Sequence, residues 1–181
     1  MHMDTTFLLG LIGSLILVSG AAYPEQKVLH PARSAKNWLF AIGGLCMFGY
    51  SLFNYLDGGP IFFLILQIFI LISSVLMMLN TPDRLDVPLL SVIAFGLIIW
   101  SLTLFEDYTT LIFIVGLCSI GIGYALKRGR DAALMFGSAL IALFSYLEAS
   151  WLFFWLNLFF AAFSGFYLWK PALKPVSAKN L

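Results

Sequence analysis

Charged side chains are scarce in this chain. Lys, Arg, Asp and Glu together account for 10% of its 181 residues, whereas 61% of the residues are hydrophobic. So much apolar surface cannot be enclosed in the core of a water-soluble protein of this length. The net charge of +1 argues against the clustered basic surface that binding to a nucleic acid requires. We therefore expect an integral membrane protein that contacts the lipid bilayer and no nucleic acid.

Metal-binding side chains are scarce as well. The two histidines, His2 and His30, lie outside the long apolar runs, which excludes a pair of axial haem ligands or a histidine-rich metal site within the bilayer. Cys46 and Cys118 each lie inside an apolar run, where a cysteine behaves as a small hydrophobic residue. We therefore expect no disulfide, no metal and no cofactor.

Groups for catalysis or proton transfer are also missing from the apolar runs. No nucleophile, base and orienting group cluster in the sequence, which gives no basis for an enzyme. No acidic residue lies in the middle of a run, which disfavours proton coupling through a buried carboxylate. The last run, residues 151–169, has no lysine that could carry a retinal Schiff base.

Seven apolar runs have the length of about 17 to 25 residues that a membrane-spanning helix needs. The first run follows His2 and Asp4 rather than the basic residues of a secretory signal, so we expect a retained helix. Pro60, Pro88 and Pro171 lie at edges of runs, where proline begins or ends a helix without losing a needed hydrogen bond. The expected helices are residues 6–23, 37–56, 61–79, 88–105, 109–126, 131–147 and 151–169.

The basic residues predict the orientation of these helices, because short loops rich in Lys and Arg stay cytoplasmic. All ten Lys and Arg follow the first, third, fifth or seventh expected helix, and the opposite loops carry only acids. We therefore expect an outside N-terminus, a cytoplasmic C-terminus with a mobile tail at residues 171–181, and a location in the bacterial inner (plasma) membrane. The acids of the outer side are Asp4, Asp57, Glu106, Asp107 and Glu148.

Residues 52–69 recur 91 positions later as residues 143–160. An ungapped alignment of the two segments has seven identities and places Asp57 opposite Glu148, each at the break between two apolar runs. Such a repeat predicts two similar halves. Because three helices cross the membrane an odd number of times, a linker helix is needed to insert both halves in the same direction.

The predicted fold is therefore all-α, with two parallel three-helix bundles joined by a linker helix (3+1+3). We expect the first bundle in residues 1–80, the linker helix in residues 81–107 and the second bundle in residues 108–170. The linker helix contains little that is polar beyond Ser91, Ser101 and Thr103, which indicates a helix that faces lipid.

The first half contains Tyr23-Pro24-Glu25-Gln26 and, ten residues after the proline, Ser34-Ala35-Lys36-Asn37. In these segments it resembles the PQ-loop family of membrane transporters. This family includes the SWEET and SemiSWEET sugar transporters, and the nicotinamide riboside transporters have a related 3+1+3 plan. Here a glutamate interrupts the Pro-Gln pair, and the expected fifth helix has Gly121 and Gly123 in place of a proline.

The resemblance implies substrate contacts through tryptophan and asparagine, for which Trp155 and Asn157 are the candidates. It also implies hinge positions at the inner ends of the first helix of each half. We expect hinge or gate residues at Pro24, Gly121 and Gly123, together with the two acidic turns at Asp57 and Glu148.

Polar side chains within the spans also indicate where a substrate site would lie. A polar group that faces hydrocarbon is costly, so it usually turns toward the interior of the bundle or a cavity. Gln67 and Asn157 lie about 10 Å below the outer surface at 1.5 Å per residue, and Tyr50 lies at a comparable depth. In the ungapped alignment Gln67 is one position out of register with Asn157. Amides and a phenol suit a neutral polar solute. The alternative is that both amides only hydrogen-bond neighbouring helices.

Two functions remain open from the sequence. The first is a facilitative transporter of a small neutral polar metabolite, such as a sugar, a nucleoside or a vitamin-like compound, by alternating access between the bundles. The second is a non-transporting scaffold, receptor or assembly subunit, which the 18 phenylalanines favour because they can fill the interior. A polar cavity between the bundles would distinguish the two. Homo-oligomers are compatible with both.

The orientation can be tested with introduced cysteines. Asp57→Cys and Glu106→Cys should react with a membrane-impermeant thiol reagent added outside intact cells, whereas Arg84→Cys and Lys127→Cys should react only after the membrane is opened. The unsubstituted chain is the control. Reaction of both pairs from the same side would refute the seven-span topology.

Overall fold

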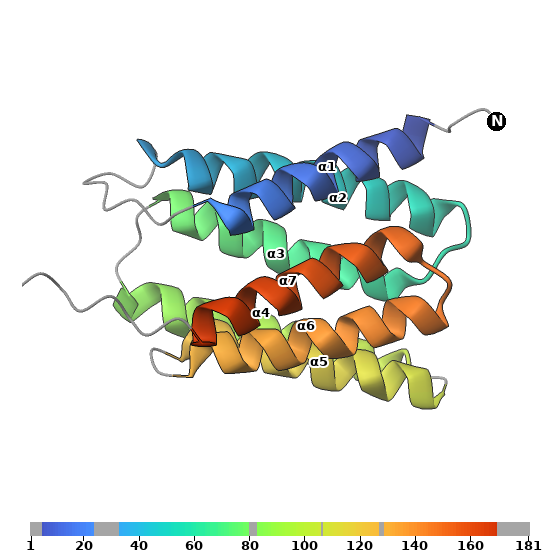
Figure 1. Cartoon of the computed structure of the whole chain (residues 1–181). Helices are drawn as coiled ribbons and strands as arrows, with labels where there is room; N and C mark the ends of the chain where they lie inside the picture. Colours follow the sequence, from blue (N-terminus) through green and yellow to red (C-terminus); the bar gives the residue numbers. More distant parts are fainter. Residues whose placement is uncertain (1–4, 24–32, 80–82, 106, 127–128, 170–181) are drawn as a thin grey trace, which may run out of the picture.

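The computed structural model describes residues 5–23, 33–79, 83–105, 107–126 and 129–169. These residues form seven α-helices, and each is long and apolar enough to cross a membrane (Figure 1). The helix ends agree closely with the expected spans, except at the start of α4. The helices are α1 (Thr5–Ala22), α2 (Ala35–Leu56), α3 (Ile61–Leu79), α4 (Asp83–Thr103), α5 (Tyr108–Ala125), α6 (Arg130–Leu147) and α7 (Trp151–Trp169).

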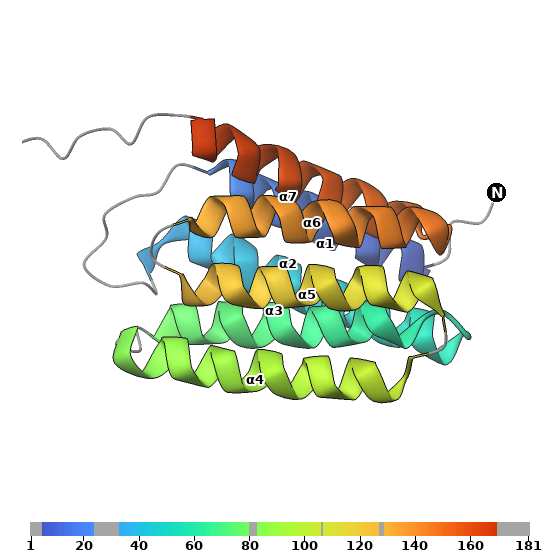
Figure 2. The same ribbon diagram turned by 90° about the horizontal axis from the view of Figure 1, so that it is seen from below.

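The helices form a closed circuit in which each packs against the next one along the chain and α7 returns to α1 (Figure 2). The most extensive contacts join α1 to α2, α5 to α6 and α6 to α7. The contacts of α1 with α7 and of α3 with α4 are much smaller. α3 is the most buried of the seven helices, so the interior of the bundle is built around it.

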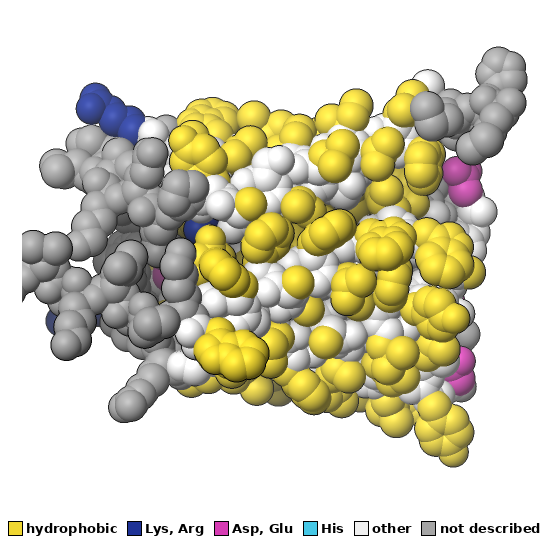
Figure 3. Space-filling model, in the orientation of Figure 1, with side chains coloured by type: hydrophobic (Ala, Val, Ile, Leu, Met, Phe, Trp, Pro, Cys, Tyr) yellow, Lys and Arg dark blue, Asp and Glu magenta, His cyan; other side chains and the backbone are white. Residues whose placement is uncertain are grey.

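The charged side chains gather at the two ends of the bundle (Figure 3). Arg33, Lys36, Arg84 and Arg130 lie at or just before the starts of α2, α4 and α6, which share one end. Three acidic side chains lie at the opposite end: Asp57, Asp107 and Glu148. The hydrophobic surface between the ends is the part that fits a bilayer, while the direction of insertion stays a prediction.

α4 begins five residues earlier than expected, which corrects the placement of Pro88 at a helix edge. The helix starts at Asp83 and contains Pro88. A proline at this sixth position removes only the hydrogen bond to the carbonyl of Arg84, which lies at the end of the bundle where water can replace it.

The sides of α4 differ in a way that fits a helix against lipid. One stripe is buried, at Leu90, Ala94, Leu97 and Ser101, and most of the other large side chains are exposed. The hydroxyls of Ser91, Ser101 and Thr103 donate to carbonyls of their own helix. α4 packs mainly on α5, with the smaller contact to α3.

The repeated acidic turns have the same backbone structure. Gly59 N donates to Asn54 O and Gly58 N to Tyr55 O, and at the second turn Ser150 N donates to Ser145 O and Ala149 N to Tyr146 O. Both pairs form the Schellman motif that ends a helix. The motif needs a left-handed residue, which is Gly58 (φ +91°) in one copy and Ala149 (φ +53°) in the other.

A second correspondence joins α1–α2 to α5–α6. A Cβ on Gly13 would lie 3.2 Å from Gly43 O, and a Cβ on Gly116 would lie 3.2 Å from Gly137 O. In return, a Cβ on Gly43 or on Gly137 would lie 2.9 Å from a backbone nitrogen of the facing helix. Each helix pair therefore crosses at a pair of glycines that allows backbones to touch. The two helix pairs therefore share this kind of close crossing.

The two turns provide a test of the shared backbone conformation. Gly58→Ala places a Cβ in the left-handed region and should cost about 1 kcal/mol of stability, whereas Ala149→Gly should be neutral or gain up to about 1 kcal/mol. The matched control is Gly96→Ala in α4, where a Cβ meets nothing within 4 Å and the helix should gain stability.

The measurement is the apparent melting temperature of each purified variant in the same detergent. A lower melting temperature for Ala149→Gly than for Gly58→Ala would contradict the shared turn.

Candidate functional site

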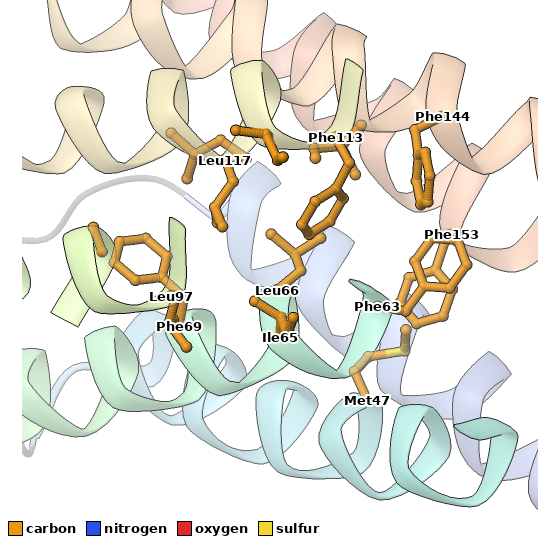
Figure 4. Packing of buried hydrophobic residues seen from close by; sticks show 14 of the residues in the cluster. Met47, Phe63, Ile65, Leu66, Phe69, Leu97, Phe113, Leu117, Phe144 and Phe153 are labelled. Carbon is orange, nitrogen blue, oxygen red and sulfur yellow. The ribbon is translucent and has the colours of Figure 1, made fainter. Parts of the chain in front are cut away.

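Buried phenylalanine rings pack against one another in the interior (Figure 4), and Phe63 and Phe153 each lie in the first turn of the helix that follows an acidic turn. We call this set the phenylalanine cluster; it comprises Phe62 and Phe63 of α3, Phe113 of α5, Phe144 of α6 and Phe153 of α7. Ring centroids of neighbouring members are 4.1 to 5.7 Å apart. The cluster therefore joins α3 to three helices of the second half, mostly through side chains rather than close backbones.

Phe63 and Phe153 make the closest contact in the cluster. Their rings are parallel within 2°, their centroids are 4.1 Å apart, and neither side chain is exposed. Each is the third residue of its helix, and α3 and α7 run in the same direction. Equivalent positions of the two halves therefore stack directly on each other.

The second helix of each half contributes one ring that contacts this stack. The Tyr50 ring of α2 lies 5.5 Å from Phe153, and the Phe144 ring of α6 lies 5.5 Å from Phe63. Gly10 leaves the space that Tyr50 occupies, since a Cβ there would lie 2.6 Å from Tyr50 Cγ. Tyr50 thus lies next to the stacked rings, and its role in binding stays a prediction.

Gln67 and Asn157 follow the stacked rings by one helical turn. Four residues separate Gln67 from Phe63 and Asn157 from Phe153, which places both amides about 6 Å further into the bundle on nearly the same helix faces. Both side chains are buried, at 0% and 5% exposure. The two expected amides thus occupy equivalent positions, each one turn after a ring of the stacked pair.

The one-position mismatch of these amides in the ungapped alignment is corrected by the turns. The first turn has four residues between helices, 57–60, and the second has three, 148–150. Counted from the start of α3 or α7, Gln67 and Asn157 are both the seventh residue. They are therefore structural equivalents, separated by 90 positions rather than 91.

The two amides differ in their hydrogen bonds. Asn157 Nδ2 donates to Phe153 O of its own helix at 2.9 Å. Neither Nε2 nor Oε1 of Gln67 has a hydrogen-bond partner, and Gln67 is the only residue with such buried atoms in the described part of the chain. An unpaired buried amide costs about 1 to 3 kcal/mol by mutational measurement.

The hydroxyls of the interior show that unpaired groups are otherwise avoided. Ser14, Ser51, Ser73, Ser74 and Ser145 each donate to a carbonyl three or four residues earlier in the same helix. Ser119 donates across to Ala133 O of α6 at 2.8 Å. Gln67 is thus an exception in a bundle that pairs its polar groups, and such an exception calls for an explanation.

Trp155 does not lie with the other expected site residues. It is 53% exposed, and its ring neighbours are Phe154 and Phe159 of the same helix. Two positions along a helix correspond to about 200°, so Trp155 faces away from Asn157. We leave it out of the site and assign it to the lipid-facing surface, where aromatic side chains are common.

The expected hinge and gate residues lie at helix contacts or helix ends. A Cβ on Gly121 would lie 3.0 Å from Ala94 Cβ of α4, and one on Gly123 would lie 2.9 Å from Leu134 of α6. Both glycines therefore have a packing role, and their role as hinges stays a prediction. Pro24 lies outside the described residues. Asp57 and Glu148 follow the last residues of α2 and α6.

The second acidic turn has a further contact to the start of α5. Asp107 caps α5 by accepting a hydrogen bond from Thr110 N, and the Thr109 hydroxyl lies 2.7 Å from Asp107 Oδ1 and 3.4 Å from Glu148 Oε1. The hydrogen bond from the Thr109 hydroxyl, followed by that from Thr110 N, holds the pKa of Asp107 below its usual value. The start of α5 and the end of α6 are therefore linked through one hydroxyl.

The stacked phenylalanines are the site residues that sequence reasoning missed. Phe62-Phe63 and Phe153-Phe154 do occur in both copies of the repeat, but the ungapped alignment pairs Phe63 with Phe154. Only the lengths of the two turns identify Phe153 as the partner. Among the described residues, no group of three His, Cys, Asp or Glu could hold a metal ion.

Comparisons with protein-family models, curated proteins and solved structures found no match to this chain. The resemblance to the PQ-loop family therefore stays a prediction from the sequence.

The unpaired state of Gln67 can be tested by a near-isosteric substitution. Gln67→Met removes the amide while keeping the side-chain length, so it should raise stability by about 1 to 3 kcal/mol. The matched control is Asn157→Leu, which removes an amide that already has a partner and should change stability by less than about 1 kcal/mol.

Thermal unfolding of the purified variants in one detergent gives the comparison. A loss of stability in Gln67→Met that exceeds the loss in Asn157→Leu would mean that Gln67 is paired in the folded protein.

Proposed function

We propose that the protein is a facilitative transporter that carries a small neutral polar metabolite across the membrane by alternating access between two three-helix bundles, α1–α3 and α5–α7. The observation that carries the proposal is the buried carboxamide of Gln67, which has no hydrogen-bond partner. A bundle that only has to be stable gains nothing from this group. A bundle that binds a solute gains hydrogen bonds when the solute meets the amide.

The location of Gln67 supports this function. Gln67 and its equivalent Asn157 are set one turn below a pair of stacked rings that belong to different halves. Transporters built from internal repeats bind their substrate at the repeat interface and expose it by rocking one repeat against the other. In this proposal the structure is a closed state, with the phenylalanine cluster on the side of the acidic turns.

The chemistry of the interior favours an uncharged solute. The described part of the membrane interior offers amides, hydroxyls and the Tyr50 phenol near the stack, and its Lys, Arg, Asp and Glu lie at the two ends. A charged solute would lose its hydration without an opposite charge to replace it. α4 would then be the linker that inserts both bundles in the same direction, with the N-terminus outside and the C-terminus in the cytoplasm.

A second candidate is a non-transporting scaffold or assembly subunit. It is favoured by the filled interior, because Phe63, Phe113, Phe144 and Phe153 are fully or almost fully buried. Rigid packing of this kind serves a scaffold without any movement. The scaffold gives no reason for the unpaired amide, so we place it second.

Solute flux separates the candidates. In proteoliposomes loaded with a panel of neutral metabolites, the native protein should carry at least one, and Gln67→Met should lower its flux about tenfold or more, because a lost hydrogen bond to a buried ligand costs about 1 to 3 kcal/mol. Asn157→Ala should lower flux to a similar extent. Ser91→Ala, on the lipid-facing α4, is the control that should leave flux unchanged.

The melting temperature of the same samples completes the test. A more stable Gln67→Met protein with reduced flux supports the transporter. Native flux in Gln67→Met, or no flux of any neutral solute through the native protein, would overturn it.

A further inference from the structure

We infer that the stacked pair Phe63 and Phe153 is a binding slot for a flat ring, and that the solute is a planar, uncharged nitrogen heterocycle of nucleobase size with amide-like groups on its edge. The inference rests on the proposed function and narrows its substrate class. Three observations carry it: the parallel rings, the amide one turn below them and the small number of polar groups around both.

The geometry of the rings suits insertion of a third ring. Phe63 and Phe153 are parallel within 2° at a centroid distance of 4.1 Å and belong to different halves of the repeat. A sandwiched ring needs two contacts of about 3.5 to 4.0 Å, which amounts to a separation of about 7 to 8 Å between the outer rings. The two halves must therefore move apart by about 3 to 4 Å while the rings stay parallel.

The contacts between the two halves of the bundle are suited to this movement. The phenylalanine cluster connects α3 to the second half through rings, and the contact of α1 with α7 is small. Separating the halves exchanges the contact between Phe63 and Phe153 for two contacts with the solute. Because aromatic stacking accepts any flat π-face, the exchange favours a planar solute over a puckered one.

The Gln67 carboxamide then determines which hydrogen-bonding groups the edge of the solute must carry. The carboxamide of Gln67 can donate and accept at the same time, which is how glutamine pairs with the adjacent donor and acceptor of an adenine edge. Asn157 occupies the equivalent position in α7 but already donates one amide hydrogen to Phe153 O. A hexose would bring five hydroxyls to a place with few partners and would leave several of them unpaired.

Equilibrium binding to the purified protein tests the slot with adenine, uracil and glucose as probes. The native protein should bind adenine or uracil and should bind glucose at least tenfold more weakly. Phe63→Leu and Phe153→Leu keep an apolar side chain but lose the flat face, and each should weaken binding of the base about tenfold or more. Phe63→Tyr keeps the ring and should retain most of the native protein's affinity for the base.

The matched control is Phe69→Leu, which changes a fully buried ring of α3 that packs on Tyr124 outside the phenylalanine cluster and should leave base affinity within about threefold. Melting temperatures show whether each variant is folded, and Phe63→Tyr gives a second readout if a leucine variant is not.

The outcomes distinguish the two proposals. Binding or transport of glucose without binding of either base would overturn the slot and leave the transporter in place. Equal binding of the bases to the native protein and to both leucine variants would have the same consequence. If neutral solutes of neither kind bind or cross, the proposed transport function fails and the slot fails with it.

Discussion

The constraint on which this structure depends is that the membrane interior offers no water to a polar group. Helices meet this constraint for the backbone, which is why seven of them make up most of the described chain. Serine hydroxyls meet it by donating to carbonyls, mostly of their own helix. Among the described residues, only Gln67 has fully buried side-chain atoms without a hydrogen-bond partner, and the proposed solute site is built on this exception.

The internal repeat explains why this exception lies where it does. The two halves share a helix crossing at paired glycines, a Schellman turn and a stack of equivalent phenylalanines. The two halves resemble each other more in these contacts than in the residues that make them. Gly10 in α1 makes room for Tyr50, whereas Phe113 in α5 packs a ring against Phe144. Gln67 and Asn157 occupy equivalent positions in α3 and α7. They differ in their hydrogen bonds, because Asn157 has a partner and Gln67 has none.

Much of the architecture follows from the sequence because a bilayer sets simple rules. The seven spans, the turns at Asp57 and Glu148 and the burial of Gln67 and Asn157 were all predictable from hydropathy, the repeat and the cost of polar groups in lipid. The start of α4 was not, because Asp83 to Val87 extends the helix beyond the apolar run. The grouping into 3+1+3, the direction of insertion and transport itself stay predictions.

The details of the site could not be read from the sequence because they depend on helix rotation. One extra residue in the first turn shifts the match between α3 and α7 by one position, or about 100° around the helix. This shift decides that Phe63 stacks on Phe153 rather than aligning with Phe154, and a similar rotation places Trp155 on the surface. Whether an amide finds a partner depends on distances of a few tenths of an ångström, which no pattern of residue types encodes.

The side-chain amide protons of Gln67 are the most direct probe of the central claim. Gln26 and Gln67 are the only glutamines in the chain, so glutamine-selective ¹⁵N labelling gives two pairs of side-chain amide resonances, which Gln67→Met assigns. We expect the Gln67 pair in the solute-free protein to exchange slowly with water and to have the upfield proton shift of an amide without a hydrogen bond. Addition of a transported solute should move this resonance downfield. A hydrogen-bonded shift in the solute-free protein that no solute changes would show that Gln67 is paired within the bundle and does not bind the solute.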